Sequence, residues 1–265
     1  NTTSTGNYYT YITGGSWELT SSMESAKYKL GGANDKTSKD GGSYTGLYEL
    51  GTNLTLLPLD YGDTSLVGYW KFDEGTGTTA YDASGHNKNG TLVNGPTWST
   101  GKQGGAINFT LTEDYVSTPN INIDDKLSIA LWAKATDGAS GRLIDKAWPE
   151  NGSFLFYRAS SNLDFGMKNV AGTRIDAMSN SNSFPAGQWI FIVGTWDNSS
   201  ANIFINAVKQ EQSVNFNGSI NRTDNLFIGG GSAATSFNGL IDDIRIYNRA
   251  LSAAEIFALY SATNK

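Results

Sequence analysis

Apolar and polar residues alternate along most of the chain after residue 65. In the segment 126–135, Leu127, Ile129, Leu131 and Ala133 share one parity, and mostly polar or small residues take the other. Such alternation is typical of a strand with one face on a core. Residues 189–196 are apolar on both parities, which predicts a strand covered on both faces. The strand-like segments are 66–72, 126–135, 188–197, 201–206, 225–230 and 239–247.

Clusters of Gly, Asn, Asp and Ser separate these segments, and little helical periodicity lies between them. Many short strands joined by regular turns predict a mainly β protein built as an antiparallel β-sandwich over residues 66–265. One helix is predicted at the end, over 253–260. Ser252 is its N-cap, Glu255 completes a capping box, and Leu251 and Ile256 form a hydrophobic staple.

The first 65 residues have a different pattern. Leu19, Met23, Ala26 and Leu30 recur at three- and four-residue spacing, which predicts a helix within residues 16–30. The runs YYTYI and GLYELGTNLTLL on either side predict short strands. The chain is therefore expected to consist of a small α+β region, 1–65, followed by the sandwich, 66–265.

Composition removes several classes of function. The net charge of −6 leaves no electrostatic footprint for DNA or RNA, so nucleic acid is not an expected partner. The chain has no cysteine, which excludes disulfides, thiolate metal sites and thiol catalysis. The one histidine, His86, lies in a glycine- and asparagine-rich segment and is expected on a surface loop. No apolar stretch is long enough to span a membrane.

The ordered motifs of the second region resemble laminin-G-like, concanavalin A-like domains. They begin with LVGYWKFDEGTG, continue through GGAINF, LSIALWAKA, GQWIFIVGTWD and ANIFIN, and close with FNGLIDDIRIYNRALSAAEI. The resemblance implies a jelly-roll sandwich that binds ligands or builds structure outside the cell. The family usually has Asn-Gly in the turn after the FIN strand, whereas this chain has Asn206-Ala207. Since alanine resists φ > 0, a turn of another type or length is expected.

The first region resembles the periplasmic part of type IV pilins and type II secretion pseudopilins, in YYTYITGGSWELTSSMESAKYKL and KDGGSYTGLYELGTNLTLLP. The resemblance implies a missing N-terminal helix that anchors the protein in a membrane and later contacts other filament subunits. The abrupt start, without a recognisable signal peptide, agrees with a processed ectodomain. The leading hypothesis is a pilin-like surface filament subunit that displays the sandwich for structure, adhesion or glycan binding on cell surfaces. The alternatives are a secreted, non-catalytic carbohydrate-binding module and, more distantly, a glycosidase.

Carboxylates near the first and last strands suggest calcium. In GLIDDIRIY, Asp242 shares its parity with Leu240 and Ile244 and is expected to point inward, whereas Asp243 is expected to face solvent. Asp73 and Asp82 follow the first strand, which is commonly a neighbour of the last strand in a sandwich. Together the three could form the oxygen shell that calcium prefers. Alternatively, Asp242 accepts hydrogen bonds from backbone or arginine and holds no ion.

Catalysis is not expected. Glycosidases hold two carboxylates across the sugar, but the adjacent Asp73 and Glu74 would project to opposite faces of a strand. Trp148 lies in the polar segment DKAWPENGS, near Arg142, Asp145 and Glu150. An indole in such a segment either contacts a ligand, for instance a sugar ring, or packs locally.

Overall fold

The computed structural model describes the strand backbones of residues 8–12, 16–21 and 48–51, and residues 63–110, 113–231 and 236–264 in full. The chain divides into two compact units. The first comprises residues 1–64 and 254–262, and the second comprises 65–253 and 263–265. Each unit is described by itself below.

The first unit contains a three-stranded antiparallel sheet in the order β1-β2-β3. Its strands are β1 (Tyr8–Ile12), β2 (Ser16–Ser21) and β3 (Tyr48–Gly51). The predicted strands at YYTYI and within GLYELGTNLTLL are confirmed. The predicted helix is wrong over Ser16–Ser21, because this segment pairs with β1 and places Trp17 opposite Tyr11 and Leu19 opposite Tyr9. Aromatic and threonine residues around a Gly14-Gly15 pair favour such a hairpin.

The remainder of that predicted helix, from Ser22 to Leu30, lies outside the described residues, as do all side chains of residues 1–62. The resemblance to pilins therefore stays a prediction. The C-terminal helix is confirmed as α1 (Ala253–Thr263), three residues longer than expected. Among the described helical residues, none form a helix that is long and apolar enough to cross a membrane.

The second unit is a sandwich of two eight-stranded sheets, and every strand pair within them is antiparallel. Sheet I has the order β17-β16-β15-β10-β19-β8-β7, with β4 also paired to β19. Its strands are β4 (Leu66–Trp70), β7 (Thr97–Thr100), β8 (Gly105–Phe109), β10 (Leu127–Ala135), β15 (Ile190–Trp196), β16 (Ser200–Ile205), β17 (Val208–Asn215) and β19 (Gly239–Tyr247). The pairing of β4 with β19 confirms that the first and last strands of the sandwich are neighbours.

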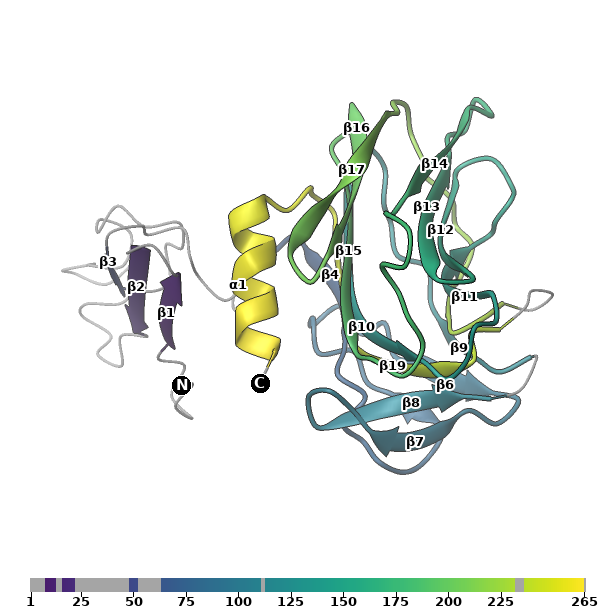
Figure 1. The fold of residues 1–265 in the computed structure, drawn as a ribbon, viewed down its shortest axis with the longest axis horizontal. Coiled ribbons are helices and arrows are strands. Elements are labelled where there is room, and N and C mark those ends of the chain that lie inside the picture. Colours follow the sequence, from purple (N-terminus) through teal and green to yellow (C-terminus); the bar gives the residue numbers. More distant parts are fainter. Residues whose placement is uncertain are drawn as a thin grey trace. The chain divides into compact units, whose positions relative to one another are not determined.

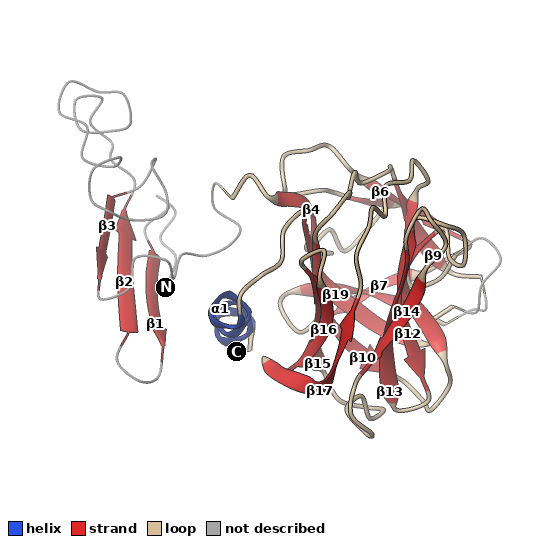
Figure 2. Ribbon diagram, turned by 90° about the horizontal axis from the view of Figure 1, so that it is seen from above, coloured by secondary structure: helices blue, strands red, loops and turns tan. Residues whose placement is uncertain are grey.

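Sheet II has the order β14-β13-β12-β11-β18-β9-β6-β5. Its strands are β5 (Thr79–Ala80), β6 (Gly90–Val93), β9 (Tyr115–Thr118), β11 (Gly141–Lys146), β12 (Ser153–Ala159), β13 (Asn162–Lys168), β14 (Arg174–Met178) and β18 (Leu226–Ile228). Figure 1 shows β10 and β15–β17 in one layer and β11–β14 in the other, and Figure 2 shows the two layers from above. The predicted antiparallel sandwich is confirmed.

The core lies between the two sheets. The residues of β10 that share a parity, Leu127, Ile129, Leu131 and Ala133, all belong to it, as predicted. From sheet II, Phe156 and Phe165 stack with their ring centroids 4.8 Å apart. Every residue of β15 is buried, which confirms a strand covered on both faces.

A bulge in β19 changes which side chains enter this core. The pairing with β10 shifts between Ala130 and Trp132, and Asp243 adopts φ +54°. Because of the extra residue, Ile241, Ile244 and Ile246 face the core, while Asp242 lies opposite Trp132 on the outer face of sheet I, the face away from the core. The predicted inward direction of Asp242 is therefore wrong, although the residue is buried. The prediction for Asp242 assumed a strand without a bulge.

The bulge also buries Asp243, which was expected to face solvent. Its residue is 4% exposed, and its carboxylate forms an ion pair with Arg245. Arg245 also donates a hydrogen bond of 2.7 Å from Nη2 to the hydroxyl of Tyr69. The buried aspartate is thus paired with a cation on the same face, as a buried charge requires.

The turn between β16 and β17 contains only Asn206 and Ala207, and both have positive φ, at 48° and 64°. The expectation of another turn type is wrong. Asn206 is held by β15, because its Oδ1 accepts a hydrogen bond of 2.9 Å from the N–H of Phe191, and its N–H donates to the Phe191 carbonyl at 2.8 Å. These contacts offset the strain of about 1 kcal/mol that alanine has in a left-handed conformation.

Candidate functional site

Two of the three aspartates predicted to bind calcium hold the turn between β7 and β8. Oδ2 of Asp242 accepts hydrogen bonds of 2.8 Å from the N–H groups of Lys102 and Gln103. Oδ1 of Asp73 accepts one of 2.7 Å from the N–H of Gly105. The structure therefore brings Asp73 and Asp242 to one turn, where both accept from the backbone.

The Asp242 carboxyl is buried and has an unusual proton affinity. Burial, together with the nearby Asp243 and Asp73 carboxylates, raises the pKa of Asp242 to about 7, although the N–H donors of Gln103 and Lys102 oppose this rise. Within the part of the chain whose side chains are described, its Oδ1 atom has no hydrogen-bond partner. A buried acceptor without a donor is costly.

Asp82 has a different role from the other two aspartates. It shapes its own loop, because Oδ1 accepts from the N–H groups of Tyr69 at 3.0 Å and Ser84 at 2.9 Å, and Oδ2 accepts from Lys88 at 2.9 Å. Burial alone would raise the pKa of Asp82, but these donors outweigh it and lower the pKa. His86, in the same loop, is exposed as expected.

The three aspartates therefore do not fit one calcium shell. Both Asp82 oxygens already accept hydrogen bonds from N–H groups, which a cation would have to displace. Over residues 63–110, 113–231 and 236–264, no group of three or more His, Cys, Asp or Glu side chains is placed to hold a metal ion. Calcium binding therefore stays a prediction from the sequence.

Trp148 is half-buried against sheet II. Its backbone N–H donates a hydrogen bond of 3.0 Å to Oδ1 of Asp145, and a Cβ at Gly166 would lie 3.1 Å from the indole ring. The guanidinium of Arg174 lies 4.7 Å from the ring centroid. Local packing, the alternative considered for Trp148, accounts for these contacts, and a role in ligand binding stays a prediction.

A surface hollow of about 320 Å³ opens beside β4 and β5, and we call it the Tyr81 hollow. It is lined by Lys71, Asp73, Glu74, Tyr81, Asp82 and Ala83. Two local features form it. Phe72 is buried in a left-handed conformation with φ +57°, which places Lys71 and Asp73 at the surface on either side. Ala80 is in the core, so the next residue, Tyr81, faces outward and is 60% exposed.

Some polar groups of the Tyr81 hollow form hydrogen bonds within the fold, and one oxygen has no partner among the described residues. Oε1 of Glu74 accepts a hydrogen bond of 2.8 Å from the N–H of Tyr81. Oε2 of Glu74 is buried and receives no hydrogen bond from any described residue. The hollow thus combines an unsatisfied carboxylate oxygen, an exposed aromatic ring and the ammonium group of Lys71. Sequence reasoning considered Asp73 and Asp82 but missed this use of Glu74 and Tyr81.

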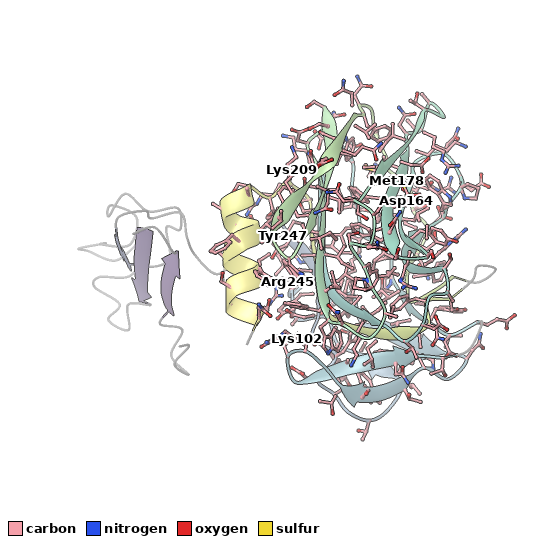
Figure 3. All side chains as sticks on the ribbon, viewed as in Figure 1. Lys102, Asp164, Met178, Lys209, Arg245 and Tyr247 are labelled. Carbon is pink, nitrogen blue, oxygen red and sulfur yellow. The ribbon has the colours of Figure 1, made fainter. Side chains whose placement is uncertain are left out.

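A second polar cluster lies on the outer face of sheet II. Asp164 of β13 is flanked in register by Tyr157 of β12 and Met178 of β14. Figure 3 labels Asp164 and Met178 side by side on these strands. Burial, followed by the Asp176 carboxylate, raises the pKa of Asp164 to about 7, although Arg174 opposes this. Sequence reasoning missed Asp164, which has the ordinary outward parity of its strand.

Solved structures with a similar fold include two toxin domains. The binding domain of Paraclostridial Mosquitocidal Protein 1 is 18% identical with a TM-score of 0.65, and the match covers 75% of this chain and 52% of that one. The botulinum neurotoxin serotype D ligand-binding domain, in complex with N-acetylneuraminic acid, is 14% identical with a TM-score of 0.60, covering 75% and 51%. The chain spans about half the length of these domains.

Domain 4 of AbnA, a GH43 extracellular arabinanase from Geobacillus stearothermophilus, was solved in complex with arabinotriose. It is 20% identical with a TM-score of 0.59, and the match covers 74% of this chain and 98% of that domain. At such identities these likenesses establish the fold alone.

No curated protein matches the chain by sequence. A family model, Laminin_G_3, described as the concanavalin A-like lectin/glucanases superfamily, matches residues 110–257. The match covers more than half of the chain and spans β9 to β19, the strands that build most of the sandwich. The chain therefore belongs to the Laminin_G_3 family of concanavalin A-like lectins and glucanases.

Proposed function

We propose that the sandwich is a non-catalytic carbohydrate-binding module that acts outside the cell and binds glycan in the Tyr81 hollow. The observation that carries this proposal is the exposed ring of Tyr81 beside the unsatisfied Oε2 of Glu74. Sugar sites combine an aromatic surface for the C–H face of the ring with a few polar groups that fix the hydroxyls.

Each lining group has a part in this recognition. The ring of Tyr81 offers the apolar surface. Oε2 of Glu74 would accept a hydrogen bond from a sugar hydroxyl, which removes the cost of leaving a buried acceptor unpaired. Lys71 is exposed at the rim and would donate to a neighbouring hydroxyl. Donor and acceptor together suit two adjacent hydroxyls of one sugar.

The relatives support a glycan as the ligand. The arabinanase domain was solved with arabinotriose and the serotype D domain with N-acetylneuraminic acid. Absence of catalysis is part of the proposal, because the carboxylates of the hollow have structural contacts: both oxygens of Asp82 and one oxygen each of Asp73 and Glu74 accept from backbone N–H groups. The filament-subunit hypothesis rests on residues 1–62 and the sequence alone, so it ranks second.

A titration of the full chain against a glycan panel tests the proposal. The panel contains arabinotriose, cellotriose, chitotriose and sialyllactose, with binding heat as the readout. Binding of at least one member is expected, and Tyr81→Ala should weaken it by about 1 kcal/mol, or five- to tenfold. Tyr81→Phe should keep most of the affinity. Val208→Ala, at another exposed apolar side chain, is the matched control and should change nothing.

No binding to any member of the panel contradicts the proposal. Equal affinities for the wild type and Tyr81→Ala contradict the placement of the ligand in the hollow.

A further inference from the structure

We propose that the outer face of sheet II around Asp164 is a second glycan-binding surface, which recognises an uncharged sugar through Asp164, Tyr157 and Met178. It shares its ligand class with the proposed function but uses different residues. Six strand positions separate β13 from β5 in sheet II. At about 4.8 Å per strand, the second surface lies on the order of 30 Å along the sheet from the Tyr81 hollow.

The register of three strands assembles this surface. Tyr157 pairs with Asp164, and Asp164 pairs with Met178, so the three side chains form one row across β12, β13 and β14. Each of these three side chains is half-buried on the outer face, because the residues of opposite parity point into the core. Those core residues are Leu163, Phe165 and Ala177. The row therefore presents an aromatic ring and a thioether to solvent with a carboxyl between them. Apolar flanks around one polar group suit a sugar ring.

One oxygen of the Asp164 carboxyl has no hydrogen-bond donor among the described residues, and a ligand could supply that donor. Its Oδ1 atom is buried, and no described residue donates a hydrogen bond to it. Burial and the Asp176 carboxylate raise the pKa of Asp164 to about 7. Below that pH the group is a carboxylic acid, which both donates and accepts a hydrogen bond. One protonated carboxyl can thus engage a donor and an acceptor on adjacent sugar hydroxyls.

The charged neighbours indicate which ligands fit. On β14, Asp176 forms an ion pair with Arg174, with Nε 2.9 Å from Oδ2. On the same strand as Asp164, Lys168 donates a hydrogen bond of 3.1 Å to the Pro149 carbonyl. Arg174 and Asp176 thus neutralise each other, and Lys168 is engaged with a backbone carbonyl, so the Asp164 carboxyl is the charge within the row itself. An anionic sugar would be repelled above pH 7, so the surface favours an uncharged one.

The ligand affinity should consequently depend on pH. On β12, the neighbour of Asp164 in register is Tyr157, and on β14 the charged groups are Asp176 and Arg174. These two side chains form an ion pair with each other. The pH dependence rests on Asp164, whose pKa is raised to about 7 and whose acid form donates to a sugar hydroxyl.

Amide spectra of the ¹⁵N-labelled full chain, titrated with arabinotriose and separately with cellotriose at pH 5.5 and 8.5, test the inference. With at least one of these sugars, cross-peaks of β12–β14 should shift at pH 5.5, with an affinity at least fivefold weaker at pH 8.5. Asp164→Asn keeps the shape and remains neutral, so its affinity should be the same at both pH values. Tyr157→Ala should abolish these shifts and leave those near Tyr81 unchanged.

Tyr81→Ala separates the two sites, because it should remove shifts at residues 71–83 only. The second surface is refuted if neither sugar shifts β12–β14 at pH 5.5, or if Tyr157→Ala leaves these shifts intact. Shifts confined to residues 71–83 refute it while supporting the proposed function. Shifts confined to β12–β14 support the second surface and refute glycan binding in the Tyr81 hollow.

Discussion

Replacing Asp164 by asparagine should stabilise the folded chain, and increasingly so as pH rises. Burial and the neighbouring Asp176 raise the pKa of Asp164 from 3.8 to about 7. Below pH 3.8 the carboxyl is protonated in both the folded and the unfolded chain, so it does not affect their difference in free energy. Between pH 4 and 7 the unfolded chain releases the proton while the folded chain keeps it. The free energy of unfolding therefore falls through this range and is constant above it.

The size of the effect follows from the same shift. A tenfold change in proton affinity corresponds to ~1.36 kcal/mol, so a pKa raised from 3.8 to about 7 sets an upper limit of about 4 kcal/mol. Asp164 is only partly buried, and water reduces this to about 2 kcal/mol. For a domain of ~200 residues this raises the melting temperature of Asp164→Asn by about 4–8 °C at pH 8.

Thermal melts followed by circular dichroism at pH 4 and pH 8 measure this difference between wild type and variant. Asp197→Asn is the control with the opposite sign. Although burial alone would raise the pKa of Asp197, N–H donors at Ser200 and Ser199 outweigh it and lower the pKa. Its removal should therefore lower stability at pH 8. Equal melting temperatures for Asp164→Asn and wild type at pH 8 would refute the reasoning.

Three further predictions concern the turn, the metal and catalysis. Ala207→Gly should raise the free energy of unfolding by about 0.5–1 kcal/mol in urea titrations, because Ala207 has φ +64°. The control Ala186→Gly changes a residue whose φ is not positive, and it should lower the free energy of unfolding. Calcium in 100-fold excess over its Kd should stabilise the folded chain by about 2.7 kcal/mol relative to the same chain with a chelator. Asp242→Asn should remove this difference. Identical melting curves of the wild type with calcium and with the chelator contradict calcium binding. Release of reducing sugar from a polysaccharide panel should stay at background, and activity lost with a single carboxylate substitution would contradict a non-catalytic module.

The strands of the sandwich could be predicted because their alternation is local. Each core residue of β10 has a polar or small neighbour, and the burial of β15 on both faces follows from its uninterrupted apolar composition. The C-terminal helix was predictable for the same reason, since its cap and staple lie within six residues. The helix predicted from residue spacing was wrong at Ser16–Ser21. There the segment pairs with β1 as a strand, and this pairing outweighs a weak helical spacing.

The site was harder to predict because it depends on local exceptions and on distant strands. The bulge at Asp243 reverses the parity of the residues before it, and nothing in GLIDDIRIY marks the position. The left-handed Phe72 determines where Asp73 lies, yet phenylalanine seldom adopts that conformation. In the sequence, Asp164 has the same pattern as any aspartate that faces outward from a strand. Its neighbours Tyr157 and Met178 come from the adjacent strands, and the sequence alone does not show which strands are adjacent.

A crystal structure of the full chain with a bound trisaccharide from the glycan panel tests the central claim most directly. The account predicts a sugar ring stacked on Tyr81, with one hydroxyl within hydrogen-bond distance of Oε2 of Glu74 and another near Lys71. A sugar bound on this chain with the Tyr81 hollow empty would contradict it.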